Sequence, residues 1–265
     1  MKDLTHGKPA RIILYFALPI LIGNLFNLAY NLADTRIVGT YLGNDALAAV
    51  GSISTLNDLL VGLIVGLANG FAVIMAQHFG SGDKNKSRKV FALSILMGLV
   101  VTAIVVAGSL IFMDGLLDWM NVMDEHREAS VAYITVIIVG LFFSIIYNVL
   151  AANLRAIGDA YTPLIFLIIS AVLNVALDIL CVKYMDMGVR GAAVATIVSQ
   201  AVSAVLCFGY TWKKYAFLHF NIKDFVPKKE FLKPMLEGGL SMGLMNSLVS
   251  FGTLSLQTAI NTLGT

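Results

Sequence analysis

Long hydrophobic stretches separated by short polar breaks dominate the chain. Seven of them are about 20 residues long or longer, which is the length that a helix needs to cross a bilayer. They lie at residues 12–37, 53–77, 90–113, 130–153, 163–183, 191–211 and 235–262. The breaks carry turn residues, such as Gly80 to Asp83 and Gly158-Asp159 before Pro163. Because every backbone polar group in lipid needs an internal partner, runs of this length predict helices. We therefore expect an all-α, polytopic membrane helix bundle.

Composition supports a membrane protein over a soluble one. The chain is 58% hydrophobic and only 13% charged, whereas a soluble domain carries roughly 25% charged residues. The first apolar run is too long for the hydrophobic region of a signal peptide, so we interpret it as the first span. The net charge of +2 gives no reason to expect a nucleic-acid partner. The two cysteines lie inside apolar runs, and no Cys/His group has metal-ligand spacing.

Lys and Arg divide unevenly between the two sides of the predicted bundle. With a cytoplasmic N-terminus, 14 of the 18 lie on the cytoplasmic side, and the loop after the third span is acidic. This bias predicts a multi-pass protein of the plasma (inner) membrane, with its N-terminus inside and the end of the seventh span outside. The longest break, 212–234, is basic. It is expected to contact anionic membrane lipids, to link two halves of a larger assembly, or to do both.

A polar stripe follows one side of the first predicted span. Asn24, Asn27, Asn31 and Asp34 fall within an arc of about 80° on a helix. Buried asparagines also form hydrogen bonds between helices, and Asp34 at the outer end could simply be solvated. Ionisable groups at membrane depth are costly, however, and usually functional. Pro19 inside the same span removes one backbone hydrogen bond and predicts a kink.

The fifth predicted span carries a matching polar face. Ser170, Asn174 and Asp178 follow the i, i+4, i+8 spacing. Asp178 and Asp34 both lie toward the outer ends of their spans, so we expect them to converge on one cavity. Two close carboxylates can share a proton. With added amide and hydroxyl oxygens they can instead bind a hard cation such as Na⁺. Thr196, Tyr133 and Asn148 are further candidates, although a threonine alone often only bonds back to its own helix.

Several motifs together resemble the N-terminal part of multidrug and toxic compound extrusion (MATE) transporters. No single motif decides the resemblance, but the order and spacing fit over essentially the whole chain. The matching positions are Leu18-Pro19, Asp34, Gly39, Leu42-Gly43, Ala46 to Gly51, Ala76-Gln77, Gly80 to Asp83, Arg155 to Asp159, Asn174, Asp178 and Gly188 to Thr196.

The resemblance implies a fold, an activity and a site. MATE proteins have twelve helices in two six-helix lobes, and they exchange Na⁺ or H⁺ for organic cations or drugs by alternating access. The resemblance assigns the coupling-cation site, including possible Na⁺ binding, to Asp34, Asn174, Asp178 and Thr196. Asn27, Asn31, Tyr133 and Asn148 are weaker candidates for lining the cavity, and Pro19 corresponds to the kink. It implies no enzyme activity and no cofactor besides the coupling ion.

The chain is shorter than such transporters, so we expect a fragment or a truncated product. The predicted organisation is a six-helix lobe at 1–211, a basic inter-lobe loop at 212–234, and the first helix of a second lobe at 235–265. That last segment faintly repeats the first: Lys233-Pro234, Asn246 and Leu263-Gly264 echo Lys8-Pro9, Asn24 and Leu42-Gly43. The repeat favours an inverted or pseudo-symmetric second lobe as the missing partner. A dimer of a genuine short product is the alternative.

Three other functions remain open. A flippase for lipid-linked or polysaccharide substrates would need basic residues in the cavity, and only Arg36 lies near a span. A non-transporting membrane scaffold would have no need of two acidic residues at matching depth. An intramembrane protease would need a catalytic pair, and no Ser–His pair lies at membrane depth; Asp34 and Asp178 lack a recognisable protease signature.

Overall fold

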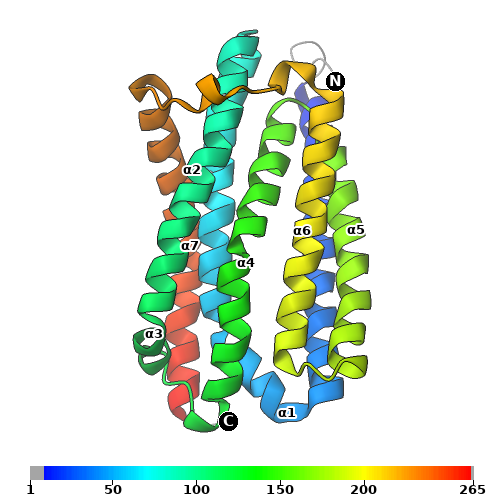
Figure 1. Cartoon of the computed structure of the whole chain (residues 1–265), viewed down its shortest axis with the longest axis vertical. Helices are drawn as coiled ribbons and strands as arrows, with labels where there is room; N and C mark the ends of the chain where they lie inside the picture. The colour runs from blue at the N-terminus through cyan, green and yellow to red at the C-terminus, as the bar shows by residue number, and fades with distance from the viewer. Residues whose placement is uncertain (1–8, 264–265) are drawn as a thin grey trace.

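The computed structural model describes the backbone of residues 9–263 as an elongated helical bundle (Figure 1). Its elements are α1 (Pro9–Gly80), α2 (Lys84–Ile111), α3 (Met113–Trp119), α4 (Asp124–Ala156), α5 (Tyr161–Asp178), a π-helix (Ile179–Tyr184), α6 (Val189–Lys214), two 3₁₀ turns (Ala216–Leu218 and Ile222–Phe225), and α7 (Lys229–Leu263). The all-α prediction is confirmed. Lys2, Lys8 and Gly264, which entered the charge and repeat arguments, lie outside the described residues.

Helix α1 is two antiparallel limbs joined at one residue. Its 72 residues would form a rod of about 108 Å, far longer than the roughly 30 Å hydrocarbon core. The chain reverses at Gly43, whose φ of 86° and ψ of −174° suit only a residue without a β-carbon. The first limb (9–42) and second limb (44–80) therefore hold the first two predicted spans (Figure 1). Both limbs are helical almost up to the bend, so the connection between them is shorter than the predicted break at 38–52.

Five stretches of the described chain are long and apolar enough to cross a membrane, and they contain six of the seven predicted spans. Within the described part of the chain, the qualifying stretches are Ala17–Gly80, Lys84–Ile111, Asp124–Ala156, Tyr161–Tyr184 and Val189–Lys214. The first stretch contains both limbs of α1. Helix α7 is present but is not among these stretches, because its sequence is interrupted by Ser, Thr and Asn residues. It begins at Lys229, one to two turns before the predicted start.

Helix α4 lies at the centre of the bundle. It contacts both α1 and α6 extensively and packs against α2 on another side. Helices α5 and α6 pack on each other and, with α1, cover the other half of the bundle (Figure 1). The inward faces carry large apolar side chains such as Phe71, Phe91, Ile134 and Leu141, all almost completely buried. This packing brings the polar faces of α1, α5 and α6 next to one another.

The basic break before α7 is folded against the end of the bundle. Asp224, whose side chain is 4% exposed, pairs with Arg88 of α2 at 3.0 Å between Oδ2 and Nε. Phe220 lies between Phe91 of α2 and Phe225, with ring centroids 6.0 and 5.0 Å away. The segment from α6 to α7 therefore holds a fixed position over α2, while its lysines stay exposed. Whether it contacts lipid head groups stays a prediction.

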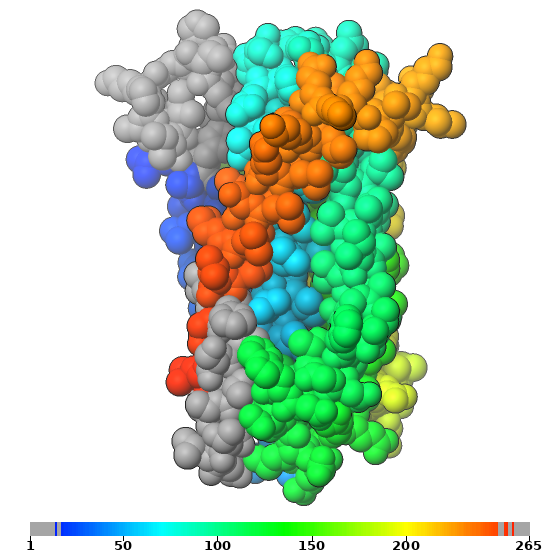
Figure 2. All heavy atoms as spheres, turned by 90° about the vertical axis from the view of Figure 1, so that its left-hand side faces the viewer, coloured from blue at the N-terminus to red at the C-terminus, as the bar shows by residue number. Residues whose placement is uncertain are grey.

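Helix α7 crosses the second limb of α1 at backbone contact distance (Figure 2). A β-carbon on Gly66 would lie 2.5 Å from Cα of Gly243, and one on Gly70 would lie 2.4 Å from the carbonyl carbon of Gly238. Side chains would not fit between the two helices here. These four residues form the glycine crossing, the small-residue arrangement by which membrane helices approach closely.

Candidate functional site

The first limb of α1 presents its polar stripe to an internal cavity. Asn27, Asn31 and Asp34 of the stripe line this cavity, and Tyr30 lines it beside them. Asn24 is exposed and is not part of the lining. The helical spacing of 3.6 residues brings the polar positions to one side, and the packing of α4, α5 and α6 against that side encloses them.

Helix α5 contributes two fully buried polar residues. Asn174 and Asp178 lie one turn apart on the face that packs against α1 and α6, and both side chains are 0% exposed. Asp178 is the last residue of the α-helix, and a π-helical segment begins at Ile179. Single π-helical turns interrupt the regular hydrogen-bond ladder and occur often at functional sites.

Asp34, which lines the cavity, meets Asp178, which is fully buried beside it. Their carboxyl groups lie within hydrogen-bonding reach of each other. Among the described residues, no N–H or O–H donates to Asp34 Oδ1 or to either carboxyl oxygen of Asp178, although these atoms are buried. A hydrogen bond between two carboxyl groups requires a proton on one of them. Two ionised carboxylates here would repel each other, and a shared proton or a bound cation would remove that repulsion.

Thr196 of α6 connects the first limb to α5. Its hydroxyl oxygen accepts a hydrogen bond from the Tyr30 hydroxyl at 3.2 Å and another from Nδ2 of Asn174 at 3.4 Å. These two donors occupy both lone pairs of Thr196. Oδ1 of Asn174 is left buried and without a partner, beside the carboxyl pair. In this arrangement Thr196 positions Tyr30 and Asn174, and Asn174 offers the free oxygen.

Neutral polar side chains, tyrosines, apolar side chains and Asp58 form the rest of the cavity, whose volume is about 300 Å³. Tyr133 and Asn148 are part of this lining. On the same walls Ser144 donates a hydrogen bond to the side chain of Gln200, and Tyr147 donates one to the carbonyl of Pro163 at 3.0 Å. The described lining contains aspartates but no Lys, Arg or His. The cavity is therefore electrostatically suited to cations.

The unpartnered oxygen atoms of Asp34, Asn174 and Asp178 fit a proton or a hard monovalent cation. Asp34 Oδ1, Asn174 Oδ1 and both carboxyl oxygens of Asp178 are buried acceptors without donors. Hard cations take carboxylate and amide oxygens of this kind as ligands. Among the described residues, no three His, Cys, Asp or Glu side chains come together, which is the grouping that transition metals prefer.

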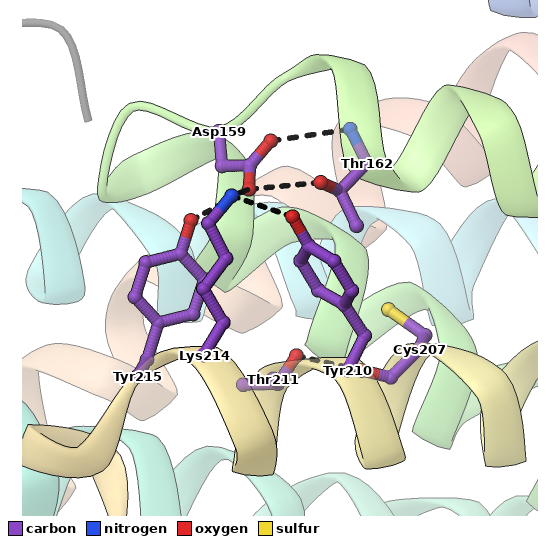
Figure 3. A network of polar contacts seen from close by, with 7 residues as sticks. All are labelled: Asp159, Thr162, Cys207, Tyr210, Thr211, Lys214 and Tyr215. Atoms are coloured by element: carbon purple, nitrogen blue, oxygen red, sulfur yellow. Dashed lines mark hydrogen bonds and ion pairs between the residues drawn. The ribbon is translucent and has the colours of Figure 1, made fainter.

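A polar cluster at the opposite end of α5 holds α6 in place (Figure 3). The Asp159 carboxylate accepts hydrogen bonds from the Tyr215 hydroxyl at 2.6 Å and from the hydroxyl and backbone N–H of Thr162 at 2.8 and 3.1 Å. Lys214 pairs with it at 3.1 Å. Burial alone would raise the pKa of Asp159, but these donors outweigh burial and hold the pKa below its ordinary value. Burial raises the pKa of Tyr215, and the nearby carboxylate adds to the effect.

The amino-acid sequence also matches a known protein family. The model of the MatE family matches residues 19–180, which include most of the first limb, all of α4 and Asp178. This chain belongs to the MatE family. The resemblance drawn from the motifs is thereby confirmed, and the chain is a multi-pass membrane protein of a multidrug exporter family.

Curated MatE relatives are similar along nearly the whole chain. The probable multidrug resistance protein YpnP of Bacillus subtilis is 28% identical over 263 residues, which cover 99% of this chain and 58% of that protein. The multidrug export protein MepA of Staphylococcus aureus is 27% identical over 241 residues, covering 91% of this chain and 53% of that protein. The chain thus spans about half the length of the curated relatives it matches.

Solved MatE structures share the fold. One, described as the inward-facing conformation of a multidrug resistance MATE family transporter of the MOP superfamily, superposes with a TM-score of 0.84 at 28% identity, covering 96% of this chain and 57% of that one. A structure of MATE in the bent conformation superposes with a TM-score of 0.82 at 30% identity, covering 90% of this chain and 53% of that one.

Several lining residues of this MatE chain were absent from the sequence prediction, and three of them could have been found from the sequence. Tyr30 lies four residues before Asp34 and belongs to the same helical face, so the spacing could have identified it. Asp58 is an ionisable residue inside an apolar span, the same signal that identified Asp34. Gln200, four residues after Thr196, shares its face of α6.

Pro19 is buried inside the first limb of this MatE chain, where the backbone stays helical. Among the described residues of α1, only Gly43 departs from helical dihedral angles. Pro19 lacks the N–H that would bond to the carbonyl of Tyr15, so the limb lacks one hydrogen bond there. A bending role for Pro19 stays a prediction.

Proposed function

We propose that this chain forms the ion-coupling half of a multidrug exporter that exchanges Na⁺ or H⁺ for organic cations or amphipathic compounds. One observation carries the proposal. Asp34 and Asp178 come from separate helices, yet their carboxyl groups meet beside a cavity that Asp34 lines and that has no basic residue in its described lining. The names of the relatives, which describe multidrug export and multidrug resistance, support drug-like substrates.

The proposed coupling follows from the charge of the carboxyl pair. With a proton or cation bound, the pair is relieved of repulsion and the first limb can pack closely on α5. When the ion leaves, repulsion between Asp34 and Asp178 separates the two helices. The absent backbone hydrogen bond at Pro19 gives the first limb a place to bend. Solved relatives are described in inward-facing and outward-facing conformations, and as bent and straight, which supports alternating access.

A second lobe is part of the proposal. Since the matched relatives are about twice as long, we infer that residues 1–211 form one lobe and that 235–265 begin a second one. Helix α7, held at the glycine crossing, would join the two lobes. A plasma (inner) membrane location with a cytoplasmic N-terminus completes the proposal. A flippase is less well supported, because the described cavity lining holds no basic side chain for a phosphate.

The test is transport of ethidium by the protein as its gene encodes it, reconstituted in vesicles with either a Na⁺ or a H⁺ gradient. We expect Asp34→Asn and Asp178→Asn each to lower ion-driven efflux at least tenfold, since an amide cannot carry the exchanged charge. Asp45→Asn is the matched control, because Asp45 is exposed just after the Gly43 bend and does not line the cavity. Full efflux by both variants would exclude the coupling role.

A further inference from the structure

Asp58 is a third carboxylate in the cavity, and the proposed coupling does not use it. It lies on the second limb of α1, with Asn57, Val61 and Val65 on the same cavity-lining face. Asp58 is exposed, whereas Asp178 is completely buried. Within the described part of the chain, Asp58 takes part in no hydrogen bond and no ion pair. A charge at membrane depth without a partner is costly and suggests a ligand.

Asp58 lies on a different limb of α1 from Asp34. Asp34 lies nine residues before Gly43 and Asp58 fifteen residues after it. At a rise of about 1.5 Å per residue, Asp34 is about 14 Å and Asp58 about 22 Å from the bend along their limbs. Asp58 therefore lines a different wall of the same cavity, farther along its own limb from the bend than Asp34.

Aromatic, neutral polar and apolar groups line the cavity that Asp34 and Asp58 share. Tyr30, Tyr133 and Tyr147 line the cavity from the first limb and from α4. Aromatic rings attract cations through their faces, and this attraction is strongest where water is excluded. The described lining carries no positive charge that would compete for Asp58. A flat organic cation fits this combination of one carboxylate, several rings and neutral hydrogen-bonding groups.

We propose that Asp58 is the anionic contact for the positively charged group of the exported compound, separate from the Asp34–Asp178 pair that binds the coupling ion. The assignment rests on the proposed export function and adds the residue that gives it a preference for cations. Asp34 and Asp178 face each other and are largely buried, so they suit a small ion. Asp58 is accessible from the cavity and can meet a charge that belongs to a larger molecule.

The experiment uses fluorescence to measure how tightly ethidium binds to the purified protein, expressed as its gene encodes it. We expect Asp58→Asn to weaken binding about tenfold or more, which is the effect of losing one charge partner in a partly dehydrated site. Asp58→Glu keeps the charge and should retain affinity within a few-fold. Asp45→Asn is the control for removing an acidic side chain that does not line the cavity.

A second readout separates substrate binding from ion coupling. At saturating ethidium, an imposed ion gradient should still release the dye from Asp58→Asn but not from Asp34→Asn. Wild-type affinity in Asp58→Asn, or loss of ion-driven release in that variant, would overturn the assignment. If the wild-type protein neither binds nor transports ethidium, the export function itself fails, and that result is distinct from a failure of Asp58 alone.

Discussion

At the scale of single residues, this protein places similar aspartates in contrasting environments. Asp34 and Asp178 lack protein donors on most of their oxygens. Asp159 lies outside the spans and receives donors from Tyr215, Thr162 and Lys214. A carboxylate surrounded by donors keeps its charge and stabilises the fold, whereas one without donors gains from a proton or cation. The surrounding donors, rather than the residue type, divide the structural role from the proposed coupling role.

We predict that Asp159→Asn lowers the thermal unfolding temperature in detergent near neutral pH. The variant loses the ion pair with Lys214 and weakens the bonds from Tyr215 and Thr162, at a cost of about 1–3 kcal/mol. Asn148→Ala in α4, which removes a single hydrogen bond to the same helix, is the control and should change the temperature much less. An unchanged unfolding temperature in Asp159→Asn would show that the cluster contributes no stability.

The same carboxylate predicts a pH dependence. The pKa of Asp159 is lower in the folded protein than its ordinary value of about 3.9. Its contribution to stability is therefore fully present above that ordinary value and is lost as the pH falls through the lower, folded pKa. The difference in unfolding temperature between wild type and Asp159→Asn should be constant from pH 7 to about 5 and shrink below about 4. A difference that grows on acidification contradicts this assignment.

At the scale of helices, close backbone contact determines where α7 lies. The glycine crossing brings α7 against the second limb of α1 without intervening side chains, and van der Waals contact over a matched surface is the main force between helices in lipid. On the other side of the bundle, large side chains fill the spaces around α4. The second limb is therefore shared between the cavity, which it lines with Asp58, and α7, which it holds through glycines.

We predict that Gly66→Ala and Gly70→Ala separate α7 from α1. The added β-carbons would lie 2.5 and 2.4 Å from backbone atoms of α7, too close for any small side-chain adjustment to relieve. Each variant should lower the unfolding temperature by several degrees. The control is Gly108→Ala in α2, where no atom lies within 4 Å of the new β-carbon and helix propensity alone favours alanine. Unfolding temperatures that match the control would exclude a tight crossing.

At the scale of the whole molecule, the connections separate into two ends. The turns at 80–84 and 156–161 and the segment from α6 to α7 lie at one end of the bundle, and the Gly43 bend, α3 and the turn at 184–189 lie at the other (Figure 1). The first end carries most of the described Lys and Arg residues of the loops. The two ends match the charge bias that predicted a cytoplasmic and an outer face.

The predicted orientation can be measured by labelling introduced cysteines in intact cells. Glu125→Cys, at the start of α4, should react with a membrane-impermeant maleimide added outside, while Ser81→Cys, in the turn before α2, should react only after the cells are opened. Cys181 and Cys207 are buried, so the wild-type chain should give little background. The reverse labelling pattern would mean that the N-terminus lies outside.

Particular residues show how far the sequence alone reaches. A charge or amide inside an apolar run stands out locally, so Asp34, Asn174 and Asp178 could be identified from hydropathy and spacing. The break between the first two predicted spans, 38–52, predicted a reversal because helices of about 20 residues must turn back at a bilayer surface. Asp58 gave the same signal as Asp34, but the residues that follow it on its helical face, Val61 and Val65, are apolar and continue no polar stripe. The packing of α1, α4 and α6 identified it as a lining residue.

The sequence by itself determined the membrane helices, their order, and the helical face on which each polar residue lies. These properties depend on hydropathy and on the 3.6-residue period, which act within one segment. The tertiary structure alone decided that Asp34 meets Asp178 without a donor, that Thr196 holds Tyr30 and Asn174, and that α7 touches α1 through glycines. Contacts between helices depend on rotation, depth and spacing of whole elements, which no local pattern specifies.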